Sequence, residues 1–334
     1  MMETKFDMAL MVKVAQMYYI DGLKQEEIAK QVQISRSLIS MILTEAKEVG
    51  IVEVNIRNPL LNNDFISSKL QEEFNLINCI AVPTSVQDVT VLRKLIAQRA
   101  VELVNQLLDN NMTVGLAWGR TCYEFVSLYR REIMLNNLTV LPLIGGSKQT
   151  ARYYQLNEMA RVLAEKMGGT PYFIHAPAIA ADMEERKMFT NTTSMRALMN
   201  KWNNMDIVVT GVGSLPSSKG LDRETYIGEY TIYKHLEADG AVGDICARYF
   251  KKSGEIVKGE YYDLVIGVPV EVLKNTKTVV CIAAGKEKVI PVLGALRTGI
   301  IDILITDEHT GMDILRYHSM TESDNDMLRR NKKE

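Results

Sequence analysis

Near the N-terminus, apolar residues recur at the spacing of three short amphipathic helices. Residues 8–20 form the first pattern, and around residues 25–31 Ile28 lies four positions before Val32 on one face. After a short link, Ser35 offers a side-chain oxygen that can cap a third helix. The apolar face of this last helix comprises Leu38, Ile39, Ile42 and Leu43. Two helices joined by so tight a turn predict a helix-turn-helix unit.

Gly50 ends this helical pattern, and residues 51–56 then alternate between apolar and polar positions, which predicts a short strand that would form a wing. A polar stretch with a proline, Pro59, follows and is typical of a linker. The end of the chain is polar and is expected to form a mobile tail. The predicted segments are therefore the helix-turn-helix domain 1–57, the linker 58–64, a large domain 65–317 and the tail 318–334.

From residue 65 onward, short runs rich in valine and isoleucine alternate with amphipathic stretches of helical period. This alternation predicts an α/β domain that is doubly wound, with a mostly parallel sheet buried on both faces. The predicted strands are 79–82, 113–117, 138–143, 172–175, 207–211, 278–283 and 301–306. The predicted helices are 65–74, 89–108, 122–130, 154–166, 194–200, 224–236, 286–296 and 308–317. Residues 240–258 interrupt the alternation and predict a hairpin insertion that turns at Ser253-Gly254.

Composition supports a globular protein of more than one domain. The chain has 334 residues, of which 47% are hydrophobic and 24% charged. The net charge of −2 argues against indiscriminate attraction to nucleic acid or membranes. The helix-turn-helix domain itself holds seven basic and eight acidic residues. Counterion release would therefore give one copy modest DNA affinity, and several copies are expected to bind together.

The cysteines and histidines point away from metal or disulfide chemistry. The four cysteines are widely spaced without a CxxC motif, as expected for reduced core thiols in a cytoplasmic protein. The four histidines are scattered, so neither a metal site nor a cofactor is predicted. No run of the sequence has the length and apolarity of a membrane span or the form of a signal peptide.

The second helix of a helix-turn-helix lies in the major groove with its N-terminal residues at base edges. Here those residues are Ser35, Arg36, Ser37 and, one turn on, Ser40. The guanidinium of Arg36 could form a bidentate contact with guanine, and the serines can contact bases or phosphates. Gln25, which opens the preceding helix, is a further candidate DNA contact. The alternative interpretation is a small helical subdomain without a DNA-binding role.

Open parallel sheets bind ligands at the carboxyl ends of their strands. Gly119, Arg120 and Thr121 follow one predicted strand and open a helix, a combination that suits a phosphate group. Asp244 is a carboxylate that could accept hydrogen bonds from sugar hydroxyls, although it could equally cap a loop. Similar glycine-bearing or charged ends follow other strands, at Gly145, Gly146, Gly211, Gly213 and Lys288. Each glycine alone could mark a tight turn, but their recurrence favours one cleft for a small anion.

Six segments occur in order across both domains: GLKQEEIAKQVQISRSLIS, GLAWGRT, LPLIGG, DIVVTGVG, GAVGDICARYF and AAGKEKVIPVLGALRTGIIDILITDEHT. Through them the chain resembles the SorC/DeoR-type sugar-binding transcriptional regulators over nearly its whole length. The resemblance implies an effector domain resembling phosphosugar isomerases, a phosphorylated sugar or polyol as effector, and dimers of dimers. It also implies phosphate contacts at residues 119–121, sugar contacts at Asp244 and Lys288, and a pocket lined by the glycines at 145, 146, 211 and 213.

Together these inferences predict a cytoplasmic transcriptional regulator of a carbohydrate operon, forming a homo-dimer or homo-tetramer. Its predicted partners are operator DNA and a phosphorylated sugar or polyol, with no membrane. The alternative is a phosphosugar isomerase or deaminase-like enzyme with a DNA-binding domain, which would need a general base such as Asp244 or His175. A further alternative is a DNA-binding scaffold whose second domain only oligomerises.

Overall fold

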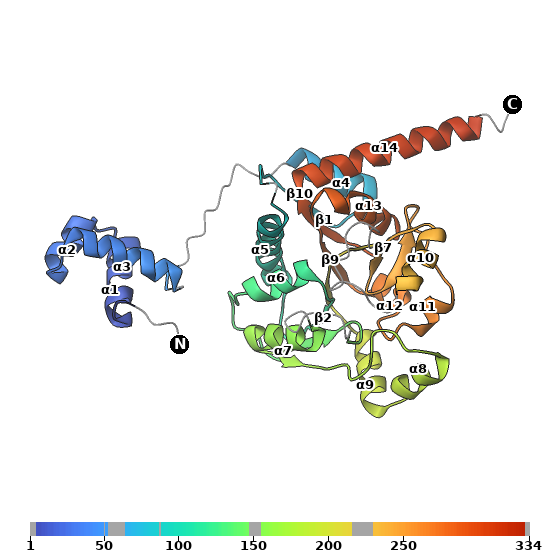
Figure 1. Cartoon of the computed structure of the whole chain (residues 1–334), viewed down its shortest axis with the longest axis horizontal. Helices are drawn as coiled ribbons and strands as arrows, with labels where there is room; N and C mark the ends of the chain where they lie inside the picture. Colours follow the sequence, from blue (N-terminus) through green and yellow to red (C-terminus); the bar gives the residue numbers. More distant parts are fainter. Residues whose placement is uncertain are drawn as a thin grey trace. The chain divides into compact units, whose positions relative to one another are not determined.

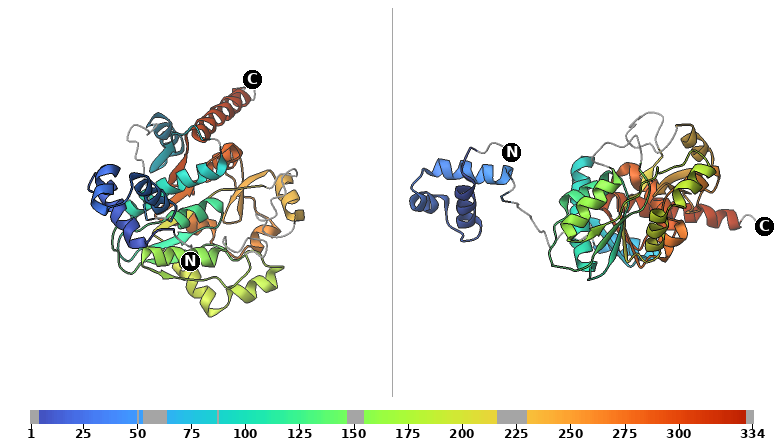
Figure 2. Two further views of the ribbon diagram at one scale, coloured as in Figure 1. Left: turned by 60° about the vertical axis from the view of Figure 1, so that its left-hand side comes forward. Right: turned by 90° about the horizontal axis from the view of Figure 1, so that it is seen from below.

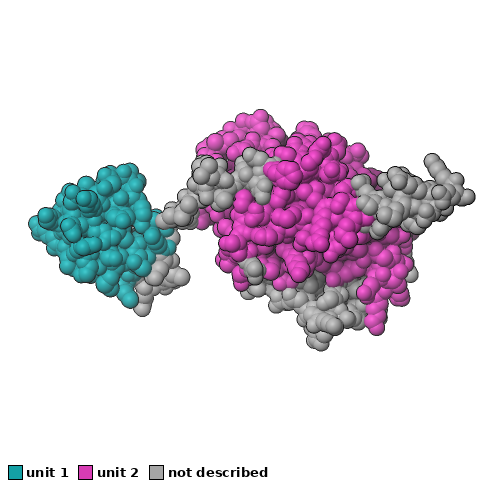
Figure 3. Space-filling model, turned by 90° about the horizontal axis from the view of Figure 1, so that it is seen from above, with its two compact units in different colours: residues 1–60 teal, residues 61–334 magenta. Residues whose placement is uncertain are grey.

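The computed structural model describes residues 5–49, 51–52, 64–86, 88–146, 155–215 and 230–330. The chain divides into two compact units, Met1–Leu60 and Leu61–Glu334 (Figure 3). The division falls within the predicted linker, whose residues 58–63 are outside the described ranges. In the part of the chain that is described, no helix combines the length and apolarity needed to cross a bilayer.

The first unit contains three helices: α1 (Met8–Tyr19), α2 (Gln25–Val32) and α3 (Arg36–Glu48). Their apolar faces form one buried core of Met11, Val14, Met17, Ile28, Ala29, Ile39, Ile42, Leu43 and Ala46. These helices confirm the predicted helix-turn-helix. The predicted wing is not confirmed, because Ile51 and Val52 lie in no strand and residues 53–56 are outside the described ranges.

The turn between α2 and α3 depends on an unusual backbone conformation. Gln33 has φ 59° and ψ 40°, the left-handed region, and its N–H donates to the carbonyl of Ala29. This conformation reverses the chain after α2, so that α3 can begin at Arg36. A residue with a side chain pays about 1–2 kcal/mol for it, which is why glycine is common at such a position.

The second unit is built on a seven-stranded parallel sheet (Figure 1). The strand order is β1-β10-β9-β5-β2-β3-β4, and every neighbouring pair is parallel. The strands are β1 (Asn78–Val82), β2 (Thr113–Leu116), β3 (Thr139–Pro142), β4 (Thr170–Pro171), β5 (Ile207–Thr210), β9 (Thr278–Ile282) and β10 (Ile303–Asp307). All residues of β5 and β10 are buried, as expected for central strands covered on both faces.

Helices cover both faces of this sheet (Figure 2). Crossovers between parallel strands are right-handed as a rule, so the direction in which the chain crosses the sheet decides which face a helix covers. The chain crosses in one direction from β1 to β4 and in the opposite direction from β4 to β10. Helices α5, α6 and α7 therefore lie on one face of the sheet, and α9 and α13 lie on the other. The helices are α4 (Asp64–Phe74), α5 (Val89–Leu107), α6 (Arg120–Leu128), α7 (Leu156–Met167), α8 (Met183–Thr190), α9 (Thr193–Trp202), α10 (Tyr230–Ala238), α11 (Glu260–Leu264), α12 (Val270–Asn275), α13 (Val289–Arg297) and α14 (Glu308–Arg330). A 3-10 turn, η3 (Lys286–Lys288), precedes α13.

The predicted hairpin turn at Ser253-Gly254 is confirmed, and a second hairpin turn that was not predicted precedes it. Strands β7 (Ala241–Ile245) and β8 (Arg248–Lys251) form a small antiparallel sheet with β6 (Gly213–Ser214). The turn between β7 and β8 is made by Cys246 and Ala247, with φ values of 52° and 59°. Two positive φ values fit the twist of a two-residue hairpin, but neither residue type signals such a turn. Ser253-Gly254 makes the predicted turn, after which Ile256 pairs antiparallel with Phe250, and the N–H of Gly254 donates to the carbonyl of Lys251 at 2.9 Å.

Two further element boundaries differ from the prediction. The strand predicted at 172–175 is replaced by β4 at Thr170–Pro171. The Asn157 side chain donates to the carbonyl of Ile174 and accepts from its N–H, each at 2.9 Å, so these backbone groups are not available to a neighbouring strand. Helix α14 continues past Tyr317, where the prediction placed its end, to Arg330. Residues 318–330 contain no glycine or proline to end a helix. The short helices α8, α11 and α12 were not predicted.

Candidate functional site

The N-terminus of α3 presents a polar, exposed face. The Ser35 hydroxyl accepts a hydrogen bond from the N–H of Leu38 at 3.2 Å, which confirms its predicted role as helix cap. Its oxygen also lies 2.9 Å from the hydroxyl of Ser37. Arg36, Ser37 and Ser40 are exposed. Donors that can contact base edges or phosphates therefore surround the start of the helix, as in a DNA-reading helix.

Helix α2 supplies the surroundings of that face. Gln25, its first residue, is half-buried. Glu26, the next residue, forms an ion pair with Arg36 in which Oε1 lies 3.4 Å from NH1. The two side chains are 68% and 67% exposed, so water surrounds the pair on most sides. The only guanidinium at the described start of α3 is thus held by a carboxylate of the preceding helix.

In the second unit, the strand order defines where a ligand can bind. The connections from β2 run outward to β3 and β4, whereas those from β5 run in the opposite direction to β9 and β10. Open sheets bind ligands outside the carboxyl ends of two neighbouring strands whose connections diverge in this way, and we call this place in the second unit the crevice. The residues that follow β2 and β5 are 117–121 and 211–213, and those that follow the adjacent β9 are 283–288. Most of the predicted effector residues lie in these three segments.

Helix α6 begins at this crevice. Its cap, Gly119, has φ 121°, which residues with a side chain rarely adopt, and the space beside its Cα is open. The N–H of Tyr123 donates to the Gly119 carbonyl at 2.9 Å, which starts the helical hydrogen-bond pattern. The backbone N–H groups of Arg120 and Thr121 precede that first bond and belong to the positive end of the helix dipole. This end of α6 can hold an anion such as phosphate.

Lys288 and Asp244 come together over the end of β5. The Lys288 ammonium donates to the Val212 carbonyl at 2.8 Å and to the Ser214 hydroxyl at 2.9 Å. Gly213 pairs with Asp244 in the small sheet, and a side chain at 213 would collide with the Asp244 carboxylate. One oxygen of that carboxylate accepts from the N–H of Ala247 at 2.9 Å.

Desolvation disfavours the charged forms of both Asp244 and Lys288. Burial raises the pKa of Asp244, although the Ala247 N–H and the Lys288 ammonium oppose the change. Burial lowers the pKa of Lys288, and the nearby positive charges of Arg120 and Arg93 add to that effect, whereas Asp244 and Glu287 oppose it. Two guanidinium groups thus act unfavourably on the Lys288 ammonium, and a bound anion would relieve that repulsion.

Gly145 and Gly146, which follow β3, have their backbone donors engaged within the protein. The N–H of Gly145 donates to the Ile266 carbonyl at 2.9 Å, and that of Gly146 donates to the Ala176 carbonyl at 2.9 Å. A side chain at 145 would collide with the backbone of Pro177. The pair therefore allows two chain segments to cross closely above the strand end, and its amide groups are not available to a ligand.

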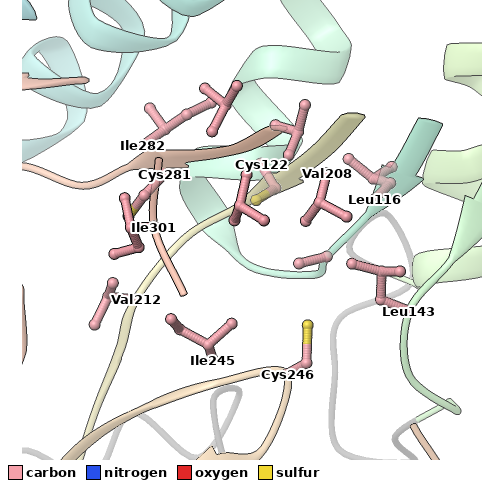
Figure 4. Close-up of a cluster of buried hydrophobic side chains, with 14 of the residues drawn as sticks. Leu116, Cys122, Leu143, Val208, Val212, Ile245, Cys246, Cys281, Ile282 and Ile301 are labelled. Atoms are coloured by element: carbon pink, nitrogen blue, oxygen red, sulfur yellow. The ribbon is translucent and has the colours of Figure 1, made fainter. Parts of the chain in front are cut away.

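Most of the described side chains below the crevice are apolar, and Thr210 is a buried polar exception. Cys122, Cys246 and Cys281 lie in one buried cluster with Val212 and Ile245 (Figure 4). Burial raises the pKa of the Cys122 thiol to about 12 and raises those of Cys246 and Cys281 as well. The N–H of Gly211 donates to the Cys122 sulfur. All four cysteines are buried and unbonded to one another, so these are protonated core thiols, as predicted.

Two residues of the crevice were not singled out in the sequence. Ser214 contacts the Lys288 ammonium. Its position directly after Gly213, at the end of the glycine motif that follows β5, is a sequence signal that could have identified it. Arg93 comes from α5, far from the glycine motifs, and only the crossover from β1 to β2 brings it near Lys288. His175 is exposed and follows the edge strand β4. Among the described residues, no group of three or more histidine, cysteine or acidic side chains is placed to bind a metal ion.

Comparisons with known proteins agree with this architecture. The sequence family described as "Putative sugar-binding domain" matches residues 58–316. The chain is 26% identical over 301 residues to the deoxyribonucleoside regulator of Bacillus subtilis, covering 90% of this chain and 95% of that protein. It is 25% identical over 316 residues to the sorbitol operon regulator of Klebsiella pneumoniae, covering 94% of this chain and all of that protein. The crystal structure of full-length SorC from Klebsiella pneumoniae superposes with a TM-score of 0.78 at 25% identity, covering 93% of this chain and 100% of that one.

Proposed function

This chain belongs to the SorC/DeoR-type family of sugar-binding transcriptional regulators, and we propose that it controls a carbohydrate-utilisation operon in response to a phosphorylated sugar or polyol. In this proposal residues 1–57 bind operator DNA, 58–64 link the two parts, and 65–317 bind the effector and join subunits. The DNA contacts are Gln25, Ser35, Arg36, Ser37 and Ser40.

The observation that carries the proposal is the combination at the crevice of a helix N-terminus, a half-buried ammonium and a buried carboxylate. The α6 N-terminus and Lys288 suit the phosphate group, because a dianion gains most where several donors carry positive charge. When ionised, the Asp244 carboxylate can only accept hydrogen bonds, and it therefore suits sugar hydroxyls. A ligand with an anionic end and a hydroxyl-bearing end would satisfy both groups at once.

The proposed effector contacts are Gly119, Arg120, Thr121, Gly211, Gly213, Asp244 and Lys288, with Ser214 added. Gly145 and Gly146 shape the wall of the same pocket and donate no hydrogen bond to the ligand, because their N–H groups are engaged elsewhere. The N-terminal positive end of α6 then fixes the phosphate, and the loops after β5 and β9 fix the sugar.

We propose no enzymatic activity for this chain. The relatives named above are regulators, and a sugar isomerase needs a base that can reach a proton next to a carbonyl. His175 is exposed after the edge strand β4 and lies on a different strand end from Asp244. Asp244 has one oxygen committed to Ala247. A turnover assay across a panel of phosphosugars should find no product, and product formation would favour the enzyme.

In this proposal, DNA affinity comes from several DNA-binding domains that bind together, each of which we call a reader. The domain formed by residues 1–57 carries one more acidic than basic residue, so a single copy gains little from counterion release. We therefore propose a homo-dimer or homo-tetramer that acts in the cytoplasm, where operator DNA is found. Effector binding would alter operator affinity by favouring one arrangement of the subunits over another.

The experiment that tests the function joins two measurements on the full chain. A thermal-shift panel of phosphorylated and unphosphorylated sugars and polyols identifies the effector, since a ligand that binds only the folded state raises the melting temperature. Fluorescence anisotropy then measures affinity for DNA from the chain's own promoter with and without that compound. Specific promoter binding that changes with a phosphorylated compound supports the proposal. A protein that binds the promoter no better than scrambled DNA would refute it.

A further inference from the structure

The ion pair between Glu26 and Arg36 occupies the group on which base reading depends. Arg36 stands at the first position of α3, and Glu26 stands in the first turn of α2. The pair has a single contact of 3.4 Å, between NH1 and Oε1, and no bidentate geometry. Because both side chains are about two-thirds exposed, the contact is screened by water and easily exchanged.

Two kinds of DNA contact would compete with Glu26 on unequal terms. A single contact between Arg36 and a phosphate replaces one screened charge pair by another, so the carboxylate is an effective competitor. A bidentate contact with guanine adds two aligned hydrogen bonds and exceeds what the carboxylate offers. Competition for Arg36 therefore weakens non-specific binding more than specific binding.

We propose that Glu26 is a specificity-determining residue that withholds Arg36 from DNA phosphates and releases it to a matching base. This inference rests on the proposed function, because it assumes that α3 reads operator DNA. It assigns Glu26 a role in the ratio of specific to non-specific affinity. Residues that contact DNA directly contribute to the affinity itself.

The test compares the full-length protein with the Glu26→Gln variant, on promoter DNA and on scrambled DNA of the same length. Anisotropy titrations are made over a series of salt concentrations. We expect the variant to bind scrambled DNA about 2- to 5-fold more tightly for each reader engaged, the range that an exposed ion pair provides. Promoter affinity should rise less, so the specificity ratio falls. If the released guanidinium takes up one phosphate, the salt slope on scrambled DNA steepens by about 0.9 per reader.

Two controls separate release of Arg36 from a general change of charge. Asp21→Asn removes the same charge from an exposed residue just before α2, and it should leave the specificity ratio unchanged. Glu26→Gln introduced together with Arg36→Ala should give no gain on scrambled DNA relative to Arg36→Ala alone. Circular dichroism confirms equal helix content in all variants.

The inference is overturned if Glu26→Gln leaves binding to scrambled DNA unchanged, or if the gain persists without Arg36. It is also overturned if the variant loses promoter affinity, which would mean that Glu26 positions the guanidinium for base reading. A failure of the proposed function looks different, because the unaltered protein would then show no preference for its promoter.

Discussion

Replacing Lys288 with methionine should separate a phosphorylated effector from its unphosphorylated parent. The ammonium has three N–H donors, and the structure commits two of them, to the Val212 carbonyl and the Ser214 hydroxyl. One donor therefore remains for the ligand. Methionine keeps much of the length of the side chain and removes both the charge and this donor.

The expected size of the effect follows from that count. One hydrogen bond to a charged group contributes about 1.5–3 kcal/mol, which corresponds to roughly 10- to 150-fold in the dissociation constant. The loss should fall on the phosphorylated compound, because the phosphate carries the charge that the ammonium recognises. The unphosphorylated parent should lose less than about 3-fold, since it retains the contact with Asp244.

Isothermal titration calorimetry of the two compounds against both proteins measures these values. Lys286→Met is the matched control, because it removes the same charge two residues away from an exposed side chain. Its effect should stay within the range of a surface charge, below about 5-fold. Thermal melting of each variant without ligand checks that the fold persists. Equal weakening of both compounds by Lys288→Met would refute the assignment of Lys288 to the phosphate.

Four further outcomes are expected. Arg36→Ala should cost about 1–3 kcal/mol of discrimination between promoter and scrambled DNA, with no change in effector affinity; retained discrimination in anisotropy assays would contradict a reading role. Gln33→Gly should stabilise the helical unit by about 1 kcal/mol, because glycine adopts φ 59° without strain, whereas Gln31→Gly inside α2 should destabilise it by a similar amount in thermal melting. Burial lowers the pKa of Lys288 from its ordinary 10.5, so calorimetry at rising alkaline pH should show affinity for the phosphorylated compound falling through that lowered pKa, with no such fall in Lys288→Met. Residues 1–58 alone should bind promoter DNA at least about 100-fold more weakly than the full chain if several readers act together; equal affinity would contradict cooperation between readers.

Sequence reasoning was most successful where one local signal decides the structure. The helix-turn-helix follows from apolar spacing and the Ser35 cap, and the parallel strands follow from short buried runs. The strand ends that form the crevice follow from the rule for open sheets, once the order of strands is known. That order is set by crossovers between distant segments, so no local pattern reveals that β5 lies beside β2.

The misses have physical causes that involve long-range contacts. The turn at Cys246-Ala247 uses two residues that give no turn signal, and its conformation is fixed by the pairing of β7 with β8. The role of Gly145 depends on Pro177, which lies far away in the chain. Helix α8 is the exception, because Asp182 and Glu185 form a capping signal that is local in the sequence.

The crowding around the crevice glycines restricts how a new effector response can be engineered. Gly119 has open space beside it but a backbone that only glycine adopts readily, whereas Gly145 and Gly213 have no room for a side chain. In a mutant library that varies these three positions, most variants would misfold. Selectivity for a different sugar must instead be sought at half-exposed side chains next to these glycines, and Thr121 and Ser214 are the positions from which such a library should start.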